Sequence, residues 1–296
     1  MATAARPFAV SISGRNKITQ KYKIAVRGNL LRFAGHSLSF DVGQIINMYS
    51  YGDHLLLKYT HLDSRWETND SESLYQTNLK RQPADWYYRN HNVNYSWNSN
   101  GYRAPEWNNI NWEQSHVLMG CSYAMGSGVD DCDTISSRVS NGVNLGQSGT
   151  SLYAIEYNTI RMIDAGIRPL TVKIIIPNLA RLTYWGDVDW IDLTPHDLSI
   201  RGDQLVSPVR NCYTGWLSIK HNAEQHGYMT ARAIQAMWKA NGVSCDLYQH
   251  WAPENPAFNQ GCQLPEPIDK ARDINLNNFA HPGRKTLELW ANIMYG

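Results

Sequence analysis

The sequence lacks the long apolar stretch that a membrane span needs. No run approaches the ~18 consecutive apolar residues of a spanning helix. The first residues, Met1 to Pro7, contain no apolar core of the kind that secretory signals carry. We therefore expect no signal peptide and no membrane span, with synthesis in the cytoplasm.

An excess of charge is missing as well. The chain has 27 Lys and Arg against 26 Asp and Glu, a net charge of +1, whereas a nucleic-acid binder normally carries a basic stripe. We expect no nucleic-acid partner. The five cysteines are odd in number and form no C-x-x-C pair, so they indicate neither a zinc site nor a disulfide framework. We expect no metal and no cofactor.

Phenylalanine is scarce, whereas the amphipathic aromatics are abundant. The chain contains 5 Phe but 11 Trp and 17 Tyr. Such rings suit carbohydrate or protein contact surfaces, although the hydrophobic core is their commoner place. With 296 residues, of which 43% are hydrophobic, the chain is long enough to bury a large core.

Two regions differ in their patterning, and the boundary falls near residue 112. Residues 1–112 are expected to form a β-rich, aromatic accessory or attachment region, in which residues 66–114 are irregular and pack on a neighbour. In the second region, residues 113–296, short apolar strands alternate with amphipathic helices, which predicts an α/β fold with a central parallel sheet. The predicted strands cover residues 116–119, 143–145, 170–176 and 243–248, and the predicted helices cover residues 133–140, 151–165, 223–240 and 285–294.

Chemically useful residues follow these strands. Ser122 stands in a tight turn after the first strand, which exposes a nucleophile to a base and to N–H donors. Glycines in the loop 144–151 allow close backbone approach to a ligand, and Asn178 follows the next strand. Parallel strands end at one edge of the sheet, so these loops and His281, just before the last helix, could share one cleft. They would supply a nucleophile, a base and oxyanion donors.

The same blocks resemble the SGNH hydrolases, also called GDSL-type esterases and lipases, over residues 115–296. Gly120-Cys121-Ser122, with Gly126 following, is similar to the nucleophile block. Asn144-Leu-Gly-Gln-Ser-Gly149 is similar to the second block, and Asp273 with His281-Pro282 is similar to the last. The segment 98–106 looks like the approach to this block in SGNH-like proteins of marine phages and bacteria.

This resemblance implies a three-layer α/β/α, flavodoxin-like domain and a serine esterase mechanism. Ser122, His281 and Asp273 would be the catalytic residues. The backbone N–H groups of Ser122 and Gly149 and the amide of Asn178 would form the oxyanion hole.

The chain also departs from the family pattern, and the departures leave alternatives open. Cys121 replaces the usual aspartate and is itself a second candidate nucleophile. The acid and the histidine are eight positions apart instead of three, so Asp269 is a substitute for Asp273. The third block lacks its usual Gly-x-Asn-Asp form, so Arg181 competes with Asn178. Three further histidines are expected on the surface or in the core: His221, His226 and His250.

The leading prediction is an acyl hydrolase, acting on a simple ester or removing acetyl groups from a carbohydrate. The alternative is a structural or adhesive component of a virus particle, such as a phage capsid or tail protein, that keeps the fold with little or no activity. The stretched Asp–His spacing favours this alternative. Assembly into a virion or a homo-oligomer is left open by the sequence.

Overall fold

The computed structural model describes residues 32–33, 36–37, 48–50, 55–59, 63–67, 70–185, 189–193, 207–219, 221–251, 261–275 and 277–296. The chain forms two compact units, Met1–Gln44 and Ile45–Gly296. In the first unit, β1 (Arg32–Phe33) and β2 (His36–Ser37) pair antiparallel. The segments 22–27 and 38–46, which pattern as β-structure, lie outside the described residues. All the other described helices and strands belong to the second unit.

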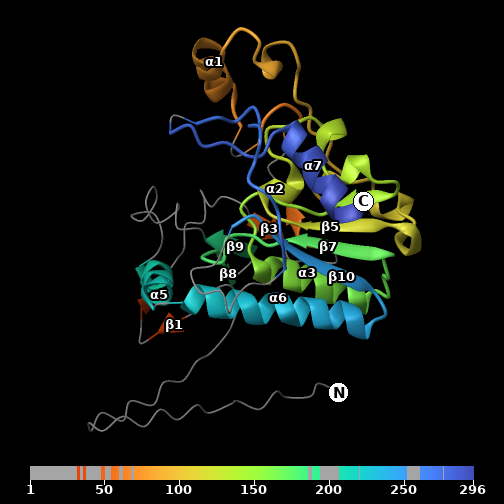
Figure 1. The fold of residues 1–296 in the computed structure, drawn as a ribbon. Helices are drawn as coiled ribbons and strands as arrows, with labels where there is room; N and C mark the ends of the chain where they lie inside the picture. Colours follow the sequence, from red (N-terminus) through yellow and green to blue (C-terminus); the bar gives the residue numbers. More distant parts are fainter. Residues whose placement is uncertain are drawn as a thin grey trace, which may run out of the picture. The chain divides into compact units, whose positions relative to one another are not determined.

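Five parallel strands form the central sheet of the second unit, in the order β11-β10-β7-β5-β6 (Figure 1). Numbered along the chain, this order is 2-1-3-4-5, an open doubly wound arrangement. In such sheets ligands bind at the carboxyl ends of the strands, where the order reverses. Here that point lies between β5 and β7. The predicted α/β fold with a central parallel sheet is thus confirmed. The strands are β5 (His116–Gly120), β6 (Gly142–Asn144), β7 (Thr171–Ile175), β10 (Ser244–Gln249) and β11 (Cys262–Gln263).

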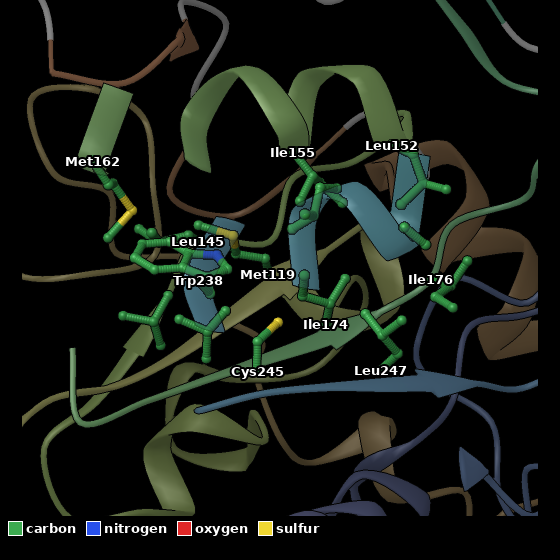
Figure 2. Packing of buried hydrophobic residues seen from close by; sticks show 14 of the residues in the cluster. Met119, Leu145, Leu152, Ile155, Met162, Ile174, Ile176, Trp238, Cys245 and Leu247 are labelled. Carbon is green, nitrogen blue, oxygen red and sulfur yellow. The ribbon is translucent and has the colours of Figure 1, made fainter. Parts of the chain in front are cut away.

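One face of the sheet is covered by α3 (Leu152–Asp164) and α6 (Asn222–Ala240), which lie side by side beneath the strands in Figure 1. Side chains alternate across a strand, so Val117 and Met119 of β5 point to this face. They pack there with Trp238 of α6 in the largest buried cluster. Figure 2 shows Trp238 enclosed between helix and sheet, beside Met119, Leu145 and Cys245.

The opposite face is covered by α7 (Arg284–Tyr295) and the short α2 (Ser122–Met125). Leu118, the β5 residue between Val117 and Met119, packs on this side with Trp290 of α7. The sheet is therefore buried on both faces. This double burial explains why β5 is an apolar run rather than an alternating pattern. In β7 and β10 a partly exposed ion pair, Lys173 with Asp246, interrupts the apolar pattern.

Local capping signals set the ends of the long helices. The Ser151 hydroxyl accepts hydrogen bonds from Tyr153 N (3.1 Å) and Ala154 N (3.4 Å) and so begins α3. After α6, Gly242 adopts φ +75°, a left-handed conformation that glycine accepts without strain. The predicted helices over 151–165, 223–240 and 285–294 are confirmed.

The stretch 66–114 is less irregular than its composition indicates. It contains α1 (Glu72–Arg81), which begins at the Ser71 cap and carries Glu72 in its first turn and Arg81 in its last. These charges complement the helix dipole, a signal that the abundance of Asn, Tyr and Trp obscures. The prediction of irregular structure was wrong for α1.

Other elements also differ from the expectation. Within the segment 54–60, which patterns as a buried strand, the described residues 55–59 contain the two-residue β4 (Lys58–Tyr59). The helix expected over 133–140 is a pair of 3₁₀ turns at 131–133 and 136–138. The pattern did not indicate α5 (Ser207–Ser218). It also missed a second, antiparallel sheet in the order β4-β3-β9-β8, with β3 (Met48–Ser50), β8 (Leu182–Trp185) and β9 (Asp189–Leu193).

By packing, residues 45–112 belong to the same compact unit as the parallel sheet. The functional division at residue 112, into an accessory region and a hydrolase-like domain, stays a prediction. None of the helices in the described part of the chain is long and apolar enough to cross a membrane.

Candidate active site

A glycine turn positions Ser122 at the carboxyl end of β5. Gly120, the last residue of that strand, has φ +151°. A Cβ atom there would lie 2.7 Å from Ile175 O and 2.8 Å from Ala124 Cβ, so a larger residue would collide with the neighbouring strand and with α2. The chain can therefore turn sharply from strand to helix only because residue 120 has no side chain, and Ser122 becomes the first residue of α2.

Ser122, His281 and Asp273 form one hydrogen-bonded series. The distance from Ser122 Oγ to His281 Nε2 is 2.7 Å, and His281 Nδ1 makes a short hydrogen bond to Asp273 Oδ2. The backbone N–H of His281 donates to the other carboxylate oxygen at 3.1 Å. All three residues are buried, although 159 positions separate the serine from the histidine in sequence.

The carboxylate determines which nitrogen of His281 carries the proton. An ionised carboxylate can only accept, so Nδ1 donates to Asp273, and in the neutral ring Nε2 is the free acceptor for the Ser122 hydroxyl. Burial by itself lowers the pKa of His281. The charge and hydrogen bond of Asp273 outweigh this, and the net pKa is raised above the ordinary histidine value. The arrangement favours uptake of the serine proton.

A short antiparallel pairing bridges the wide spacing between acid and histidine. Ala271 N donates to His281 O at 2.9 Å, and Lys270 forms an isolated bridge with Pro282. Asp273 and His281 lie next to these paired residues, so their side chains meet although they are eight positions apart.

The substitute acid, Asp269, occupies another place. Its carboxylate accepts from Thr286 N at 2.8 Å and from Lys285 N at 3.1 Å. It therefore caps the first turn of α7. Between the two acids, the structure brings Asp273 and not Asp269 to the imidazole.

Cys121, the other candidate nucleophile, is buried, and the hydrogen bond of His281 Nε2 goes to its neighbour Ser122. Adjacent residues at the tight turn point in different directions, so the base faces the hydroxyl. The acidic run 130–133 caps a 3₁₀ turn through Asp130, whose side chain accepts from Asp131 N.

The loop that carries Gly149 lies against the nucleophile turn. Gln147 N donates to Gly120 O at 3.0 Å, and Asn144 Nδ2 donates to Ala124 O at 3.1 Å. Gly149 is half-buried and adopts φ +78°. Close approach of this loop to α2 also requires Gly146, because a Cβ there would lie 2.4 Å from Met125 N.

Asn178 and Arg181 share the turn that follows β7. Asn178 is exposed, and its side-chain oxygen accepts from Ala180 N at 2.8 Å, so the amide is fixed with its NH₂ group left as the donor. Arg181 is half-buried, and its Nη1 donates to Thr150 O at 3.2 Å, next to Gly149. Both side chains thus stand at the carboxyl edge of the sheet, and their roles as oxyanion donors stay predictions.

Sequence reasoning missed two rings beside the histidine. The Tyr123 ring lies against His250, tilted by 42° with centroids 4.1 Å apart, and meets His281 edge-on at 5.2 Å. Burial lowers the pKa of His250 to about 4, with the charges of Arg181 and His281 acting in the same direction. His250 directly follows β10, so the rule that ligands bind at the carboxyl ends of strands could have singled it out.

A buried ion pair holds the loop that carries the acid. Arg272 contacts the Asp70 carboxylate through Nη2 (2.6 Å) and Nε (3.0 Å). Asp70 accepts from the Tyr95 hydroxyl at 2.8 Å, and that hydroxyl accepts from Gly128 N at 2.9 Å. Gly128 O in turn accepts from Arg272 N at 3.0 Å. Asp70 and Tyr95 therefore position Arg272, the residue directly before Asp273.

Replacing Arg272 with leucine should lower the free energy of unfolding by about 3–5 kcal/mol, because it leaves the buried Asp70 carboxylate without its cation. Urea unfolding followed by circular dichroism measures the loss. The matched control is Arg232→Leu at an exposed helix position, which should change stability by less than about 0.5 kcal/mol. Equal effects of the two substitutions would contradict the assigned role of the pair.

The chain matches no protein-family model, and no curated protein matches it significantly. Within the described ranges, no three His, Cys, Asp or Glu side chains are grouped so that they could hold a metal ion.

Proposed function

We propose that this chain is a serine ester hydrolase of the SGNH type that works through an acyl-serine intermediate. The observation that carries the proposal is the buried Ser122–His281–Asp273 series at the carboxyl edge of a parallel sheet. The strand order 2-1-3-4-5 supports a flavodoxin-like, three-layer interpretation. The order of the blocks along the chain supports it as well.

In the acylation step, the Ser122 oxygen attacks the ester carbonyl carbon while its proton passes to His281 Nε2. The negative charge that develops on the carbonyl oxygen is stabilised by N–H donors. Ser122 N, at the first turn of α2, has no intrahelical acceptor; with Gly149 N and the Asn178 amide it completes the oxyanion hole. The carbon–oxygen bond to the alcohol then breaks, and His281 returns the proton to the leaving oxygen.

Deacylation repeats the same chemistry with water. His281 takes a proton from the water, the hydroxide oxygen attacks the acyl carbon, and the Ser122 oxygen leaves with the proton from His281. Asp273 stays ionised throughout and stabilises the imidazolium that forms in each half-reaction. The half-buried Arg181 adds positive charge on the side of Gly149.

The aromatic excess gives limited support to a carbohydrate substrate. Many of the described Trp and Tyr side chains are core residues, which is their commoner use: Tyr88, Tyr95, Tyr102, Tyr213, Trp238 and Trp290 are all buried. The proposed substrate is therefore a short acyl ester in general, and the acyl ester of a carbohydrate is one member of that class. Because the structure bridges the stretched Asp–His spacing, the argument from spacing for an inactive virion component falls away.

A fluorophosphonate probe tests the proposal directly. The chain should be labelled at Ser122 and should turn over p-nitrophenyl acetate, because only a serine activated by a base reacts with such a probe. Ser122→Ala and His281→Ala should lose both properties. Ser127→Ala is a matched control: this serine is buried five residues further on, and its hydroxyl has no hydrogen-bond partner among the described residues. Labelling that persists in Ser122→Ala, or none in the parent chain, would refute the proposal.

A further inference from the structure

Among the residues between Asp273 and His281, the described ones (274–275 and 277–280) are tied together by hydrogen bonds around Asn275. Its backbone N–H donates to Phe279 O at 2.8 Å, and its side-chain oxygen accepts from Phe279 N at 3.0 Å and from Asn277 N at 2.9 Å. Lys270 Nζ donates to Asn278 O at 2.5 Å. Both backbone polar groups of Phe279 are therefore held, and the position of this residue is fixed.

A few large hydrophobic side chains among the described residues are exposed to solvent. Phe279 is the aromatic residue among them. Its exposed fraction is 52%. Its ring meets the His281 ring edge-on, with centroids 5.8 Å apart and an interplanar angle of 73°. Exposing a phenyl ring forgoes the stabilisation that burial would bring. The turn nevertheless fixes it beside the base and leaves half of its surface free.

The chemistry of the proposed reaction places the leaving alcohol on this side of the site. His281 returns the proton to the leaving oxygen, so that oxygen must come within hydrogen-bond distance of Nε2. The acyl oxygen, by contrast, faces the N–H groups of Ser122 and Gly149. The Phe279 ring meets the ring of this base and is half exposed, so it is available to the alcohol part of an ester bound beside Nε2.

We propose that Phe279 is a specificity-determining residue that binds the ring of the leaving alcohol. The inference rests on the proposed esterase function and names its substrate class: short acyl esters of ring alcohols, in which a flat aryl or pyranose face packs on the phenyl ring. Because Asn275 holds the turn in place, little ordering is needed on binding. The inserted residues thus add alcohol recognition to the acid–histidine pair.

Acetates of different alcohols test this assignment on the 296-residue chain. Phe279→Ala should raise KM for phenyl acetate and for an acetylated methyl xyloside by about 3–10-fold, the usual size of one aromatic contact. The KM for ethyl acetate and the kcat for all three should stay unchanged. Phe279→Tyr should restore KM, and Met229→Ala, an exposed residue of α6, should have no effect. If only the KM for phenyl acetate rises, the Phe279 ring binds aryl alcohols. If only the KM for the xyloside rises, it binds sugars.

Binding to the Ser122→Ala variant tests Phe279 without turnover. An NMR titration with phenyl acetate and with the acetylated xyloside should show at least one of them bound about 3–10-fold more weakly when Phe279→Ala is added. Equal binding of both compounds with and without Phe279 would overturn the inference, as would an equal rise of KM for every acetate. Failure of the esterase proposal has a different signature, the absence of Ser122-dependent turnover.

Discussion

Replacing Ser122 with alanine is expected to lower kcat for ester hydrolysis by about 10⁴-fold or more. Its hydroxyl oxygen lies 2.7 Å from the basic nitrogen of His281, and without it no acyl-enzyme can form. What remains should be only the rate that binding and oxyanion stabilisation provide, which in other serine hydrolases is about 10³–10⁴ above the reaction in water. Steady-state hydrolysis of p-nitrophenyl acetate measures the loss.

Two controls separate this chemical effect from a structural one. Ser122→Ala removes one hydrogen bond in a buried turn, so its thermal midpoint should stay within a few degrees of the parent's. Cys121→Ala should keep most of the activity, because the base faces the neighbouring residue. A Ser122→Ala variant that retains turnover, or a Cys121→Ala variant that loses it with its fold intact, would show that the nucleophile is wrongly assigned.

Replacing Asp273 with asparagine should lower kcat by about 10⁴-fold while leaving the fold intact. The amide can donate a hydrogen bond to Nδ1, which stabilises the tautomer with the proton on Nε2. In that tautomer the ring cannot accept the Ser122 proton. Asp269→Asn is the matched control: Asp269 caps α7, and asparagine keeps one acceptor oxygen for this cap, so the substitution should cost no more than about 1 kcal/mol of stability and leave kcat unchanged. A loss of kcat in Asp269→Asn but not in Asp273→Asn would identify Asp269 as the acid that supports His281.

The same pair of variants gives a pH signature. Only neutral His281 can take the serine proton, so activity should fall as the pH drops through its pKa, which Asp273 raises above the ordinary histidine value. Without that carboxylate, burial alone lowers the pKa, so the acidic limb of kcat/KM should move to lower pH in Asp273→Asn. It should stay in place in Asp269→Asn. If the acidic limb does not shift in Asp273→Asn, then a group other than Asp273 raises the pKa of His281.

Local pattern was enough to predict the sheet and the nucleophile turn. The strand around Val117 is buried on both faces and therefore reads as an apolar run, and the strand around Val172 is apolar apart from Thr171 and Lys173. The glycine before Cys121-Ser122 and the capping serine at 151 are equally local signals. Their conformational and capping preferences depend on few neighbours. The helices α3, α6 and α7 follow from the same kind of evidence.

The choice between Asp273 and Asp269 could not be made from spacing, because a turn of any length returns the chain to the same place once its ends pair. That pairing, Ala271 with His281, is a tertiary fact. The contact of Tyr123 with His250 and the ion pair of Arg272 with Asp70, 202 positions apart, are also tertiary facts. Side chains far apart in sequence leave no periodic trace of their contact. The strand segments and the place of the nucleophile can thus be predicted from the sequence. The order of the strands in the sheet, the choice of Asp273 over Asp269 and the position of the exposed Phe279 beside the base are decided only when the packed sheet brings distant loops to one edge.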